Sequence, residues 1–248
     1  MTTGPLFFIM KQEFLRNGLA LDQDEHQFGF STDAMVLADF AGIPPGSSVM
    51  DLCAGSGAVG FLLLSREPTL QITALELQQA PWELARQNAR RNGLDGQFQA
   101  VKGDVRAIRT LFGSGSFSHV VCNPPYFPVN AGLPDREEAF ALSRTELACT
   151  LDDVCSAASW LLRGKGCFYL VHRPQRMADL ICSLRQTRLE PKILRLVQHR
   201  PGAAPSLVLI KAVKDGRPGL EVPSPLILRG TDNAPTEDYL RIYGLQPG

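Results

Sequence analysis

From residue 47 onwards, the sequence alternates between short apolar runs and longer amphipathic stretches. The runs are rich in β-branched and apolar residues, as buried strands are. The stretches between them repeat apolar residues at helical spacing. The runs are SSVMDL, LQITALE, QFQAVKGD, FSHVVCN and GCFYLVH, followed by two closing runs, PKILRLVQH and PSLVLIKAV. This alternation predicts an α/β fold in which helices cover both faces of a mostly parallel sheet.

The first 46 residues follow a different pattern. GLALDQDEHQFGFS is typical of a hairpin or loop, and TDAMVLADFAG predicts a short helix with Ser31 or Thr32 as its N-cap. We therefore expect an N-terminal hairpin and helix extension over residues 1–46 and one main domain over residues 47–248. A chain of 248 residues is long enough to bury a core without disulfide or metal support.

The charges balance over the whole chain but not within its parts. Lys plus Arg and Asp plus Glu both number 25, which argues against a wholly basic nucleic-acid coat protein. Residues 1–60 carry two basic against seven acidic side chains, a net charge of −5. Residues 163–200 carry nine basic against two acidic side chains, a net charge of +7. This asymmetry fits a side that faces a polyanion and fits solvated helix and strand faces equally well.

The sequence also indicates the environment of the protein. Its longest apolar run, near Val59–Leu64, is far shorter than the about 20 residues that a membrane helix needs. The N-terminus lacks the basic lead of a secretory signal. The six cysteines show no CxxC pair and no metal-ligand spacing. We therefore expect free thiols, no metal site, no membrane contact and a cytoplasmic location.

A glycine turn follows the first apolar run. Gly55, Gly57 and Gly60 have the spacing G-x-G-x-x-G, which lets the backbone approach a ligand and packs a helix on a strand. This spacing alone also fits dinucleotide binding. However, Asp51 opens the turn, and an acid suits a cationic ligand end better than a pyrophosphate. No basic residue nearby adds a phosphate contact, so an aminoacyl-sulfonium ligand fits, with its ammonium near Asp51.

Two further acids follow at the ends of the next two strands. Glu76 lies 21 residues after Gly55, as a ribose-binding carboxylate should, and Asp104 is placed to accept from an adenine amine. Each of these acids alone is more simply explained as a loop residue. Three acids in series around a glycine turn favour a pocket, because ligands of open α/β sheets bind beyond the carboxyl ends of the strands.

The fourth strand ends at Asn123-Pro124-Pro125-Tyr126. The two prolines stiffen the backbone and remove two N–H donors, so its carbonyls stay available as acceptors. Together with the side-chain carbonyl of Asn123, they can hold both hydrogens of a planar amino group while the Tyr126 ring stacks on it. This grip directs the nitrogen lone pair toward a methyl donor. A rigid turn is the alternative, and the neighbouring glycine turn favours the functional interpretation.

In this order and spacing, DLCAGSGAVG, LELQQ, GDV and NPPY resemble the class I S-adenosylmethionine-dependent methyltransferases that methylate amino groups. That group includes adenine-N6 DNA and RNA enzymes and the glutamine methyltransferase of release factors. Over nearly the whole chain, the sequence is similar to the bacterial tRNA1(Val) adenine-N6-methyltransferase family. The resemblance implies a Rossmann-like seven-stranded sheet whose last strand is antiparallel, and S-adenosyl-L-methionine as the cofactor.

The resemblance also implies roles for particular residues. The glycine turn would line the methionine end, the acid after the second strand would take the ribose, and the acid after the third would frame the adenine. The implied cofactor-binding residues are Asp51, Cys53, Ala54, Gly55, Gly57, Glu76, Leu77, Asp104, Val105 and Asn123. The implied catalytic residues, which hold the target amine, are Asn123, Pro124 and Tyr126.

Arg173 and Arg176 follow the fifth strand directly and, with Pro125, are the residues we expect to contact RNA. Arginine forks suit phosphate oxygens, although a helix start with two solvated arginines is the alternative.

We therefore expect N6-methylation of an adenine in RNA, with a tRNA anticodon loop as the preferred site. The expected partner is tRNA or another RNA, and a monomer is compatible with the sequence. The alternative is a protein-glutamine N5-methyltransferase acting on a release factor, because a side-chain amide is also planar. The release-factor enzymes, however, are similar to one another in having a longer helical N-terminal domain than residues 1–46 could form. A non-enzymatic RNA-binding protein with a vestigial pocket is disfavoured, because both sites are intact in the sequence.

Overall fold

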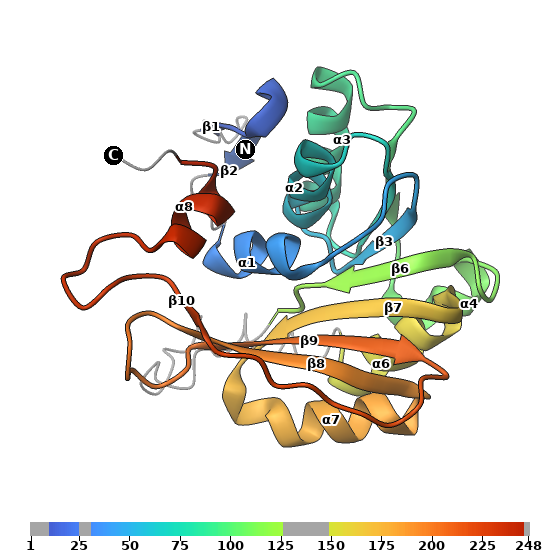
Figure 1. The fold of residues 1–248 in the computed structure, drawn as a ribbon. Coiled ribbons are helices and arrows are strands. Elements are labelled where there is room, and N and C mark those ends of the chain that lie inside the picture. The colour runs from blue at the N-terminus through green and yellow to red at the C-terminus, as the bar shows by residue number, and fades with distance from the viewer. Residues whose placement is uncertain (1–9, 25–30, 126–148, 246–248) are drawn as a thin grey trace, which may run out of the picture.

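The structure is a computed structural model, and it describes residues 10–24, 31–125 and 149–245 (Figure 1). At its centre is an eight-stranded sheet with the order β10-β8-β9-β7-β6-β3-β4-β5. Its strands are β3 (Ser48–Leu52), β4 (Gln71–Glu76), β5 (Phe98–Lys102), β6 (Phe117–Cys122), β7 (Leu162–His172), β8 (Leu189–Gln198), β9 (Leu207–Lys214) and β10 (Leu226–Ile227). Neighbouring strands are parallel, except that β9 runs antiparallel to both β7 and β8.

This sheet confirms the mostly parallel α/β fold and the antiparallel last strand. The strands from β3 to β9 are the seven that the family resemblance implied, and β10 is an eighth that the sequence analysis did not predict. In β10, Leu226 pairs with Val197 of β8, and both side chains are buried. Burial of this apolar segment attaches the C-terminal region to the edge of the sheet. A two-residue strand has no periodicity from which it could be predicted.

Helices cover both faces of the sheet. Successive strand residues point to opposite faces, so Val49 and Tyr169 pack in one hydrophobic cluster while Met50 and Phe168 pack in the other. The first face carries α1 (Thr32–Phe40), α2 (Ala58–Arg66), α3 (Gln79–Arg91) and α8 (Glu237–Tyr243), and the second carries α4 (Ile108–Leu111), α6 (Leu151–Leu161) and α7 (Met177–Gln186). Short 3-10 turns are η1 (Arg16–Gly18), η2 (Val105–Ala107) and η3 (Pro174–Arg176).

The N-terminal hairpin consists of β1 (Met10–Phe14) and β2 (Ala20–Asp24). Its second strand lies within the segment 18–31 from which a hairpin or loop was predicted, whereas β1 lies before that segment. Residues 25–30 lie outside the described residues. Asn88 of α3 and Asn92, which caps the end of that helix, attach β2 to the main body, because each side-chain amide both donates to and accepts from the backbone of β2, at 2.8–3.0 Å. These two amides thus form the kind of paired hydrogen bonds with the β2 backbone that a neighbouring strand would form.

Helix α1 begins as the sequence predicted. The Ser31 hydroxyl accepts a hydrogen bond from the backbone N–H of Ala34 at 3.2 Å, and Asp33 lies in the first turn. Residues 34–38 of this helix are buried in the same cluster as Val49 of β3 and Phe61 of α2. The helix of the N-terminal extension therefore contributes directly to the core of the sheet.

Candidate active site at the carboxyl edge of the sheet

The parallel strands bring their carboxyl ends to one edge of the sheet, which we call the carboxyl edge. Strand pairing sets Leu52 of β3 beside both Leu75 of β4 and Cys122 of β6, and Cys122 beside Leu170 of β7. The residues that follow these positions therefore emerge side by side. They include Cys53, Glu76 and Asn123, which the sequence places far apart. This edge is where open α/β sheets bind ligands.

The glycine turn joins β3 to α2 over residues 53–57. Cys53, Gly55 and Gly57 all have positive φ, at 56°, 56° and 85°. The turn is held from below by β4, because Ala54 N–H donates to the Leu75 carbonyl at 3.0 Å. It also closes on itself, as Gly57 N–H donates to the Ala54 carbonyl at 2.9 Å. The result is a tight, left-handed bend at the start of a helix, a geometry that glycine adopts without strain.

The glycines of the turn have different surroundings. A Cβ at Gly55 would meet nothing within 4 Å, so the backbone there faces open space. A Cβ at Gly57 would lie 2.7 Å from the Phe98 ring, and one at Gly60 would lie 2.8 Å from the same ring. Gly55 therefore leaves room for a ligand, whereas Gly57 and Gly60 allow α2 to pack closely on the sheet.

The carboxyl group of Asp51 lies beneath this turn and is only 1% exposed. One oxygen, Oδ2, accepts from the backbone N–H of Gly60 at 3.0 Å. The other, Oδ1, has no hydrogen-bond partner among the described residues. Burial, with a smaller effect from the charge of Glu76, raises the pKa of Asp51 to about 7. A buried acceptor without a donor is costly, and a ligand ammonium would satisfy it.

Glu76, the last residue of β4, also contacts the turn. Its Oε2 accepts from Gly55 N–H at 2.8 Å and its Oε1 accepts from Gln78 N–H at 2.8 Å. The predicted neighbourhood of Glu76 and Gly55, 21 residues apart, is thus a direct hydrogen bond. Each carboxylate oxygen can accept a second hydrogen bond, so a ligand diol could still be held. The next residue, Leu77, leaves 42% of its surface exposed.

Asp104 lies two residues beyond the end of β5 and is the N-cap residue of η2. Its carboxylate accepts from the backbone N–H of Arg106 at 2.8 Å and forms an ion pair with the Arg106 guanidinium at 2.6 Å. The hydrogen bond from the Arg106 side chain lowers the pKa of Asp104. Sequence reasoning missed Arg106, although the Asp-x-Arg spacing was a signal for it. The next residue, Val105, is buried.

Asn123 and the two prolines directly follow β6. Asn123 is half-buried, Pro124 is buried and Pro125 is exposed, while Tyr126 lies outside the described residues. No side-chain hydrogen bond holds the Asn123 amide among the residues that the structure describes. Its carbonyl therefore remains available to an incoming amino group.

Three thiols pack beneath this corner. The Cys53 thiol contacts both Cys122, the last residue of β6, and Cys149, which precedes α6. The hydrogen bond with Cys122 raises the pKa of Cys53. The half-buried side chain of Cys53 is therefore a neutral thiol that packs against the core, and its backbone forms part of the turn. Ala54, the next residue in the turn, is half-buried.

Arg173 directly follows β7 on the same edge. Its Nη1 donates to the Ser206 carbonyl at 3.3 Å, and its charge acts on Asp33 of α1. The neighbouring His172 is buried, and burial lowers its pKa to about 4, so it is neutral near pH 7. Arg176, one turn further, pairs with Asp179 at 2.7 Å on an exposed helix surface. The two arginines thus have different surroundings.

Two more arginines lie on this edge, and the sequence analysis did not assign them to the site. The pairing of His172 with Val208 and of Val208 with Leu196 sets the ends of β7 and β8 level. Arg200 follows β8, and Arg229 follows β10, where its N–H donates to the His199 carbonyl at 2.9 Å. Along this edge, three acidic side chains therefore lie at or just beyond the ends of β3, β4 and β5, three arginines lie beyond β7, β8 and β10, and Asn123 lies between the two groups.

Within the described part of the chain, no helix is long and apolar enough to cross a bilayer. In the same part, no three His, Cys, Asp or Glu side chains are grouped so as to hold a metal ion.

Comparisons with known proteins agree with this geometry. Residues 33–181 match the family model of the methyltransferase small domain. A tRNA1(Val) (adenine(37)-N6)-methyltransferase of Porphyromonas gingivalis is 28% identical over 195 residues, covering 76% of each chain. An enzyme of the same name from Shewanella is 29% identical over 160 residues, covering 64% of this chain and 66% of the relative.

Among solved structures, a predicted O-methyltransferase from Agrobacterium tumefaciens is similar, with a TM-score of 0.71 and 25% identity. The match covers 86% of this chain and 96% of that one. The sequence-based identification of a class I methyltransferase is confirmed. The chain belongs to the methyltransferase small domain family, and it is a methyltransferase whose cofactor is S-adenosylmethionine.

Proposed function

We propose that this enzyme methylates the N6 atom of an adenine in tRNA, with the anticodon loop as the target region. The observation that carries the proposal is the arrangement of the carboxyl edge. The glycine turn and Glu76 lie on one side of Asn123, and Arg173, Arg200 and Arg229 lie on the other. Arginines suit a phosphate backbone, and curated relatives are named as tRNA adenine-N6-methyltransferases.

The chain offers a site for each part of the cofactor. The unpartnered Oδ1 of Asp51 fits the ammonium, the open space at Gly55 fits the methionine backbone, and Glu76 retains acceptor capacity for the ribose hydroxyls. The exposed side chain of Leu77 offers an apolar surface for the adenine. When bound, S-adenosylmethionine supplies an electrophilic methyl group on a positively charged sulfur.

Asn123 and Pro124 would position the nucleophile. The side-chain carbonyl oxygen of Asn123 and the backbone carbonyl oxygen of Pro124 accept hydrogen bonds from the two N–H groups of the adenine amine. These bonds draw the nitrogen lone pair out of conjugation with the ring. Pro124 and Pro125 carry no N–H that could compete for these acceptors. No strong base is needed, because the extra proton can leave the nitrogen after the methyl group has been transferred. The family resemblance assigns stacking of the target base to Tyr126, which lies outside the described residues.

An unpaired loop base is the easier substrate for such a site. Extruding a paired base costs a few kcal/mol, whereas stacking on an aromatic side chain returns about 1–3 kcal/mol per base. Because bacterial tRNA is found in the cytoplasm, we expect this enzyme to act there.

The test is methyl transfer from radiolabelled S-adenosylmethionine to three acceptors: bulk tRNA, ribosomal RNA and a release factor. We expect label on tRNA, recovered as N6-methyladenosine by nucleoside mass spectrometry. Label on the release factor alone would reject the proposal in favour of glutamine methylation. Asn123→Ala should abolish turnover, whereas calorimetry should show that the cofactor still binds. An active Asn123→Ala enzyme would refute the role of the amide.

A further inference from the structure

An arginine and two tyrosines form a stack near the end of the chain. The guanidinium carbon of Arg229 lies 4.5 Å from the ring centroid of Tyr239. The Tyr239 and Tyr243 rings are stacked, with centroids 4.2 Å apart and an interplanar angle of 19°. Among the described residues, Arg229 forms no ion pair, so an acidic side chain does not neutralise its charge. We call these three residues the Arg229 stack.

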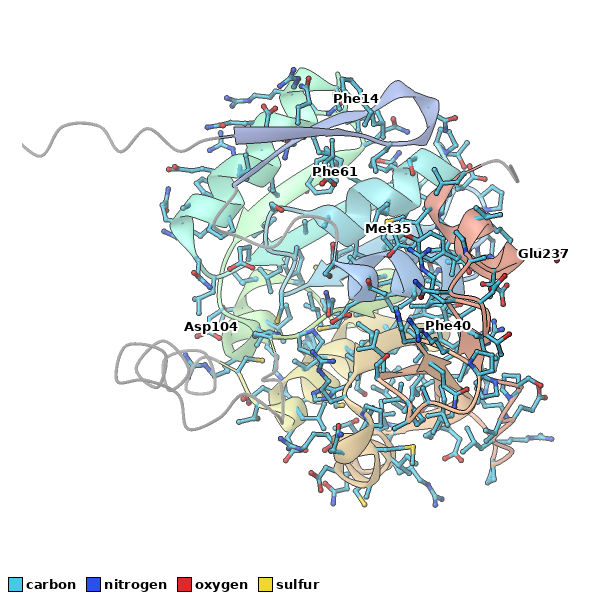
Figure 2. The ribbon with its side chains drawn as sticks, turned by 90° about the vertical axis from the view of Figure 1, so that its left-hand side faces the viewer. Phe14, Met35, Phe40, Phe61, Asp104 and Glu237 are labelled. Atoms are coloured by element: carbon cyan, nitrogen blue, oxygen red, sulfur yellow. The ribbon has the colours of Figure 1, made fainter. Side chains whose placement is uncertain are left out.

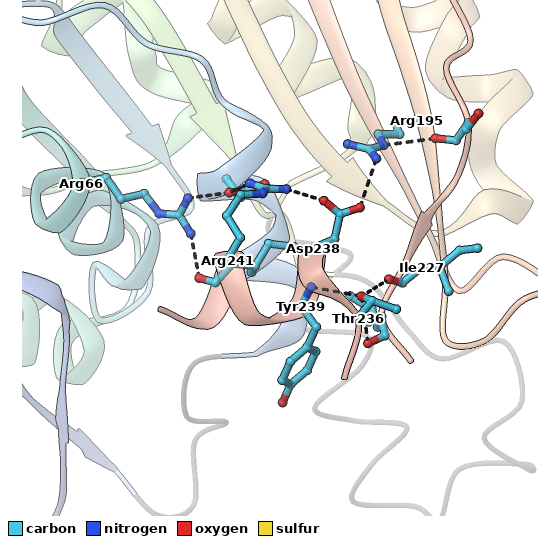
Figure 3. Close-up of polar contacts among 11 residues, drawn as sticks. Arg66, Arg195, Ile227, Thr236, Asp238, Tyr239 and Arg241 are labelled. Carbon is cyan, nitrogen blue, oxygen red and sulfur yellow. Dashed lines mark hydrogen bonds and ion pairs between the residues drawn. The ribbon is translucent and has the colours of Figure 1, made fainter. Parts of the chain in front are cut away.

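The Arg229 stack is held rigidly. The Thr236 hydroxyl donates to the Ile227 carbonyl of β10 at 2.6 Å and accepts from Tyr239 N–H of α8 at 3.2 Å (Figure 3). A single hydroxyl thus joins the strand that precedes Arg229 to the helix that carries Tyr239. In Figure 3 the Tyr239 ring points away from the ion pairs on the opposite side of α8. Fixed partners reduce the entropy lost when the stack binds a ligand.

A chain of ion pairs fixes α8 itself. Asp39 of α1 pairs with Arg66 of α2 at 2.7 Å and also binds Arg241 of α8 (Figure 3). Arg241 pairs with Asp238 at 2.8 Å, and Asp238 pairs with Arg195 of β8 at 3.6 Å. Ion pairs therefore attach helix α8 to α1 on one side and to β8 on the other, and they fix the position of the Arg229 stack.

The Arg229 stack adjoins the carboxyl edge. Arg229 follows β10 at this edge, and the Tyr243 hydroxyl lies 3.3 Å from Thr32 Oγ1 in the first turn of α1. The next residue of that turn, Asp33, faces Arg173 beyond β7. Figure 2 shows Asp104 and Glu237 on opposite sides of the molecule. Helix α8, which carries Glu237, therefore lies far from Asp104. The Arg229 stack also lies outside the residues matched by the family model, 33–181.

A guanidinium over an aromatic ring is suited to nucleobases. Its plane continues a stack, its positive charge favours the π-face of a base, and the phosphate backbone is attracted to the same side. We propose that Arg229, supported by Tyr239 and Tyr243, stacks against an unpaired base of the substrate RNA near the methylated adenine. Arg229 is thus a positioning residue. This inference rests on the proposed tRNA methyltransferase activity.

The experiment measures tRNA binding and methylation by the full chain with Arg229→Lys and Arg229→Ala. Lysine keeps the charge but lacks the plane, so Arg229→Lys should raise the Kd for tRNA about tenfold with an unchanged salt dependence. Arg229→Ala should weaken binding at least as much. Because it also removes a positive charge, it should reduce the magnitude of the negative slope of log K against log salt by about 0.7–0.9. In both variants, KM for tRNA should rise while kcat and the cofactor Kd change less than twofold.

Arg109 provides a matched control, because its guanidinium lies 5.0 Å from the ring centroid of Trp160. Trp160 is near the end of α6, where β7 begins, at the opposite edge of the sheet. Arg109→Lys and Arg109→Ala should leave tRNA binding unchanged. Wild-type affinity in Arg229→Lys would indicate a phosphate contact and overturn the stacking inference. If the wild-type enzyme instead fails to bind or methylate tRNA, the proposed function itself fails.

Discussion

Gly55 and Gly60 belong to the same motif but should respond differently to alanine. At Gly60, in the first turn of α2, the new Cβ would lie 2.8 Å from Phe98 and 2.9 Å from Ile72. Phe98 cannot retreat freely, because it stacks on Phe61 with ring centroids 4.0 Å apart. Overpacking of this kind costs about 1–3 kcal/mol, of which better helix propensity offsets up to about 1 kcal/mol. We expect Gly60→Ala to lower the free energy of unfolding by about 1–2 kcal/mol.

At Gly55 the reason for any loss is different. No atom lies within 4 Å of the new Cβ, so the only cost to folding is the positive φ of 56°, about 1 kcal/mol. The Cβ would instead occupy the open space in which we propose that the cofactor approaches the backbone. We expect Gly55→Ala to weaken cofactor binding at least tenfold, and Gly60→Ala to weaken it much less.

Two measurements separate these effects. Urea unfolding reports the free energy of unfolding of each variant. In thermal unfolding, a change of 1 kcal/mol in a chain of this size corresponds to a shift of about 2–4 °C in Tm. Calorimetric titration with S-adenosylhomocysteine reports the affinity of the cofactor site. Equal losses of affinity in the two variants, or a Gly60→Ala protein as stable as wild type, would refute the division of roles between these glycines.

Three further predictions concern charged residues. Because burial raises the pKa of Asp51 to about 7, from about 3.9 in an unfolded chain, its contribution to stability is complete below about pH 4 and is lost as the pH rises through about 7. The wild type should therefore lose stability relative to Asp51→Asn as the pH rises from 5 to 8, as measured by urea unfolding. A difference in the free energy of unfolding that stays constant over this range would contradict this prediction. Burial alone would raise the pKa of Asp39, but hydrogen bonds from Arg241 and Arg66 outweigh it and lower the pKa. Asp39→Asn should lower the free energy of unfolding by about 2 kcal/mol at pH 7. The difference from wild type should shrink at low pH, where acid protonates Asp39 in the wild type. An unchanged Tm at pH 7 would show that these ion pairs do not stabilise the fold. Arg173→Ala combined with Arg176→Ala should lower the salt slope of RNA binding by about one to two, and an unchanged slope would remove both arginines from the RNA site.

Short-range patterns in the sequence were enough to predict much of this protein. The strands, the glycine turn and the Ser31 cap depend on residues within a few positions of each other, so local periodicity and turn chemistry reveal them. The proximity of Gly55 and Glu76 was also predictable, because a strand–helix–strand unit of known length brings them together.

Other features depend on contacts between distant segments. The Arg229 stack needs β10 to pair with β8 and α8 to dock on α1, and neither event leaves a periodic signal. The Arg106 ion pair and the neutral thiol of Cys53 likewise follow from what surrounds each side chain in the folded protein. The amino-acid sequence by itself therefore determined the fold class and the cofactor, and it located the corner at Asn123 that we propose holds the target amine, through local propensity and spacing. Only the tertiary structure decided which charges are neutralised and which arginine is left over an aromatic ring beside that edge, because burial and ion pairing depend on three-dimensional neighbours.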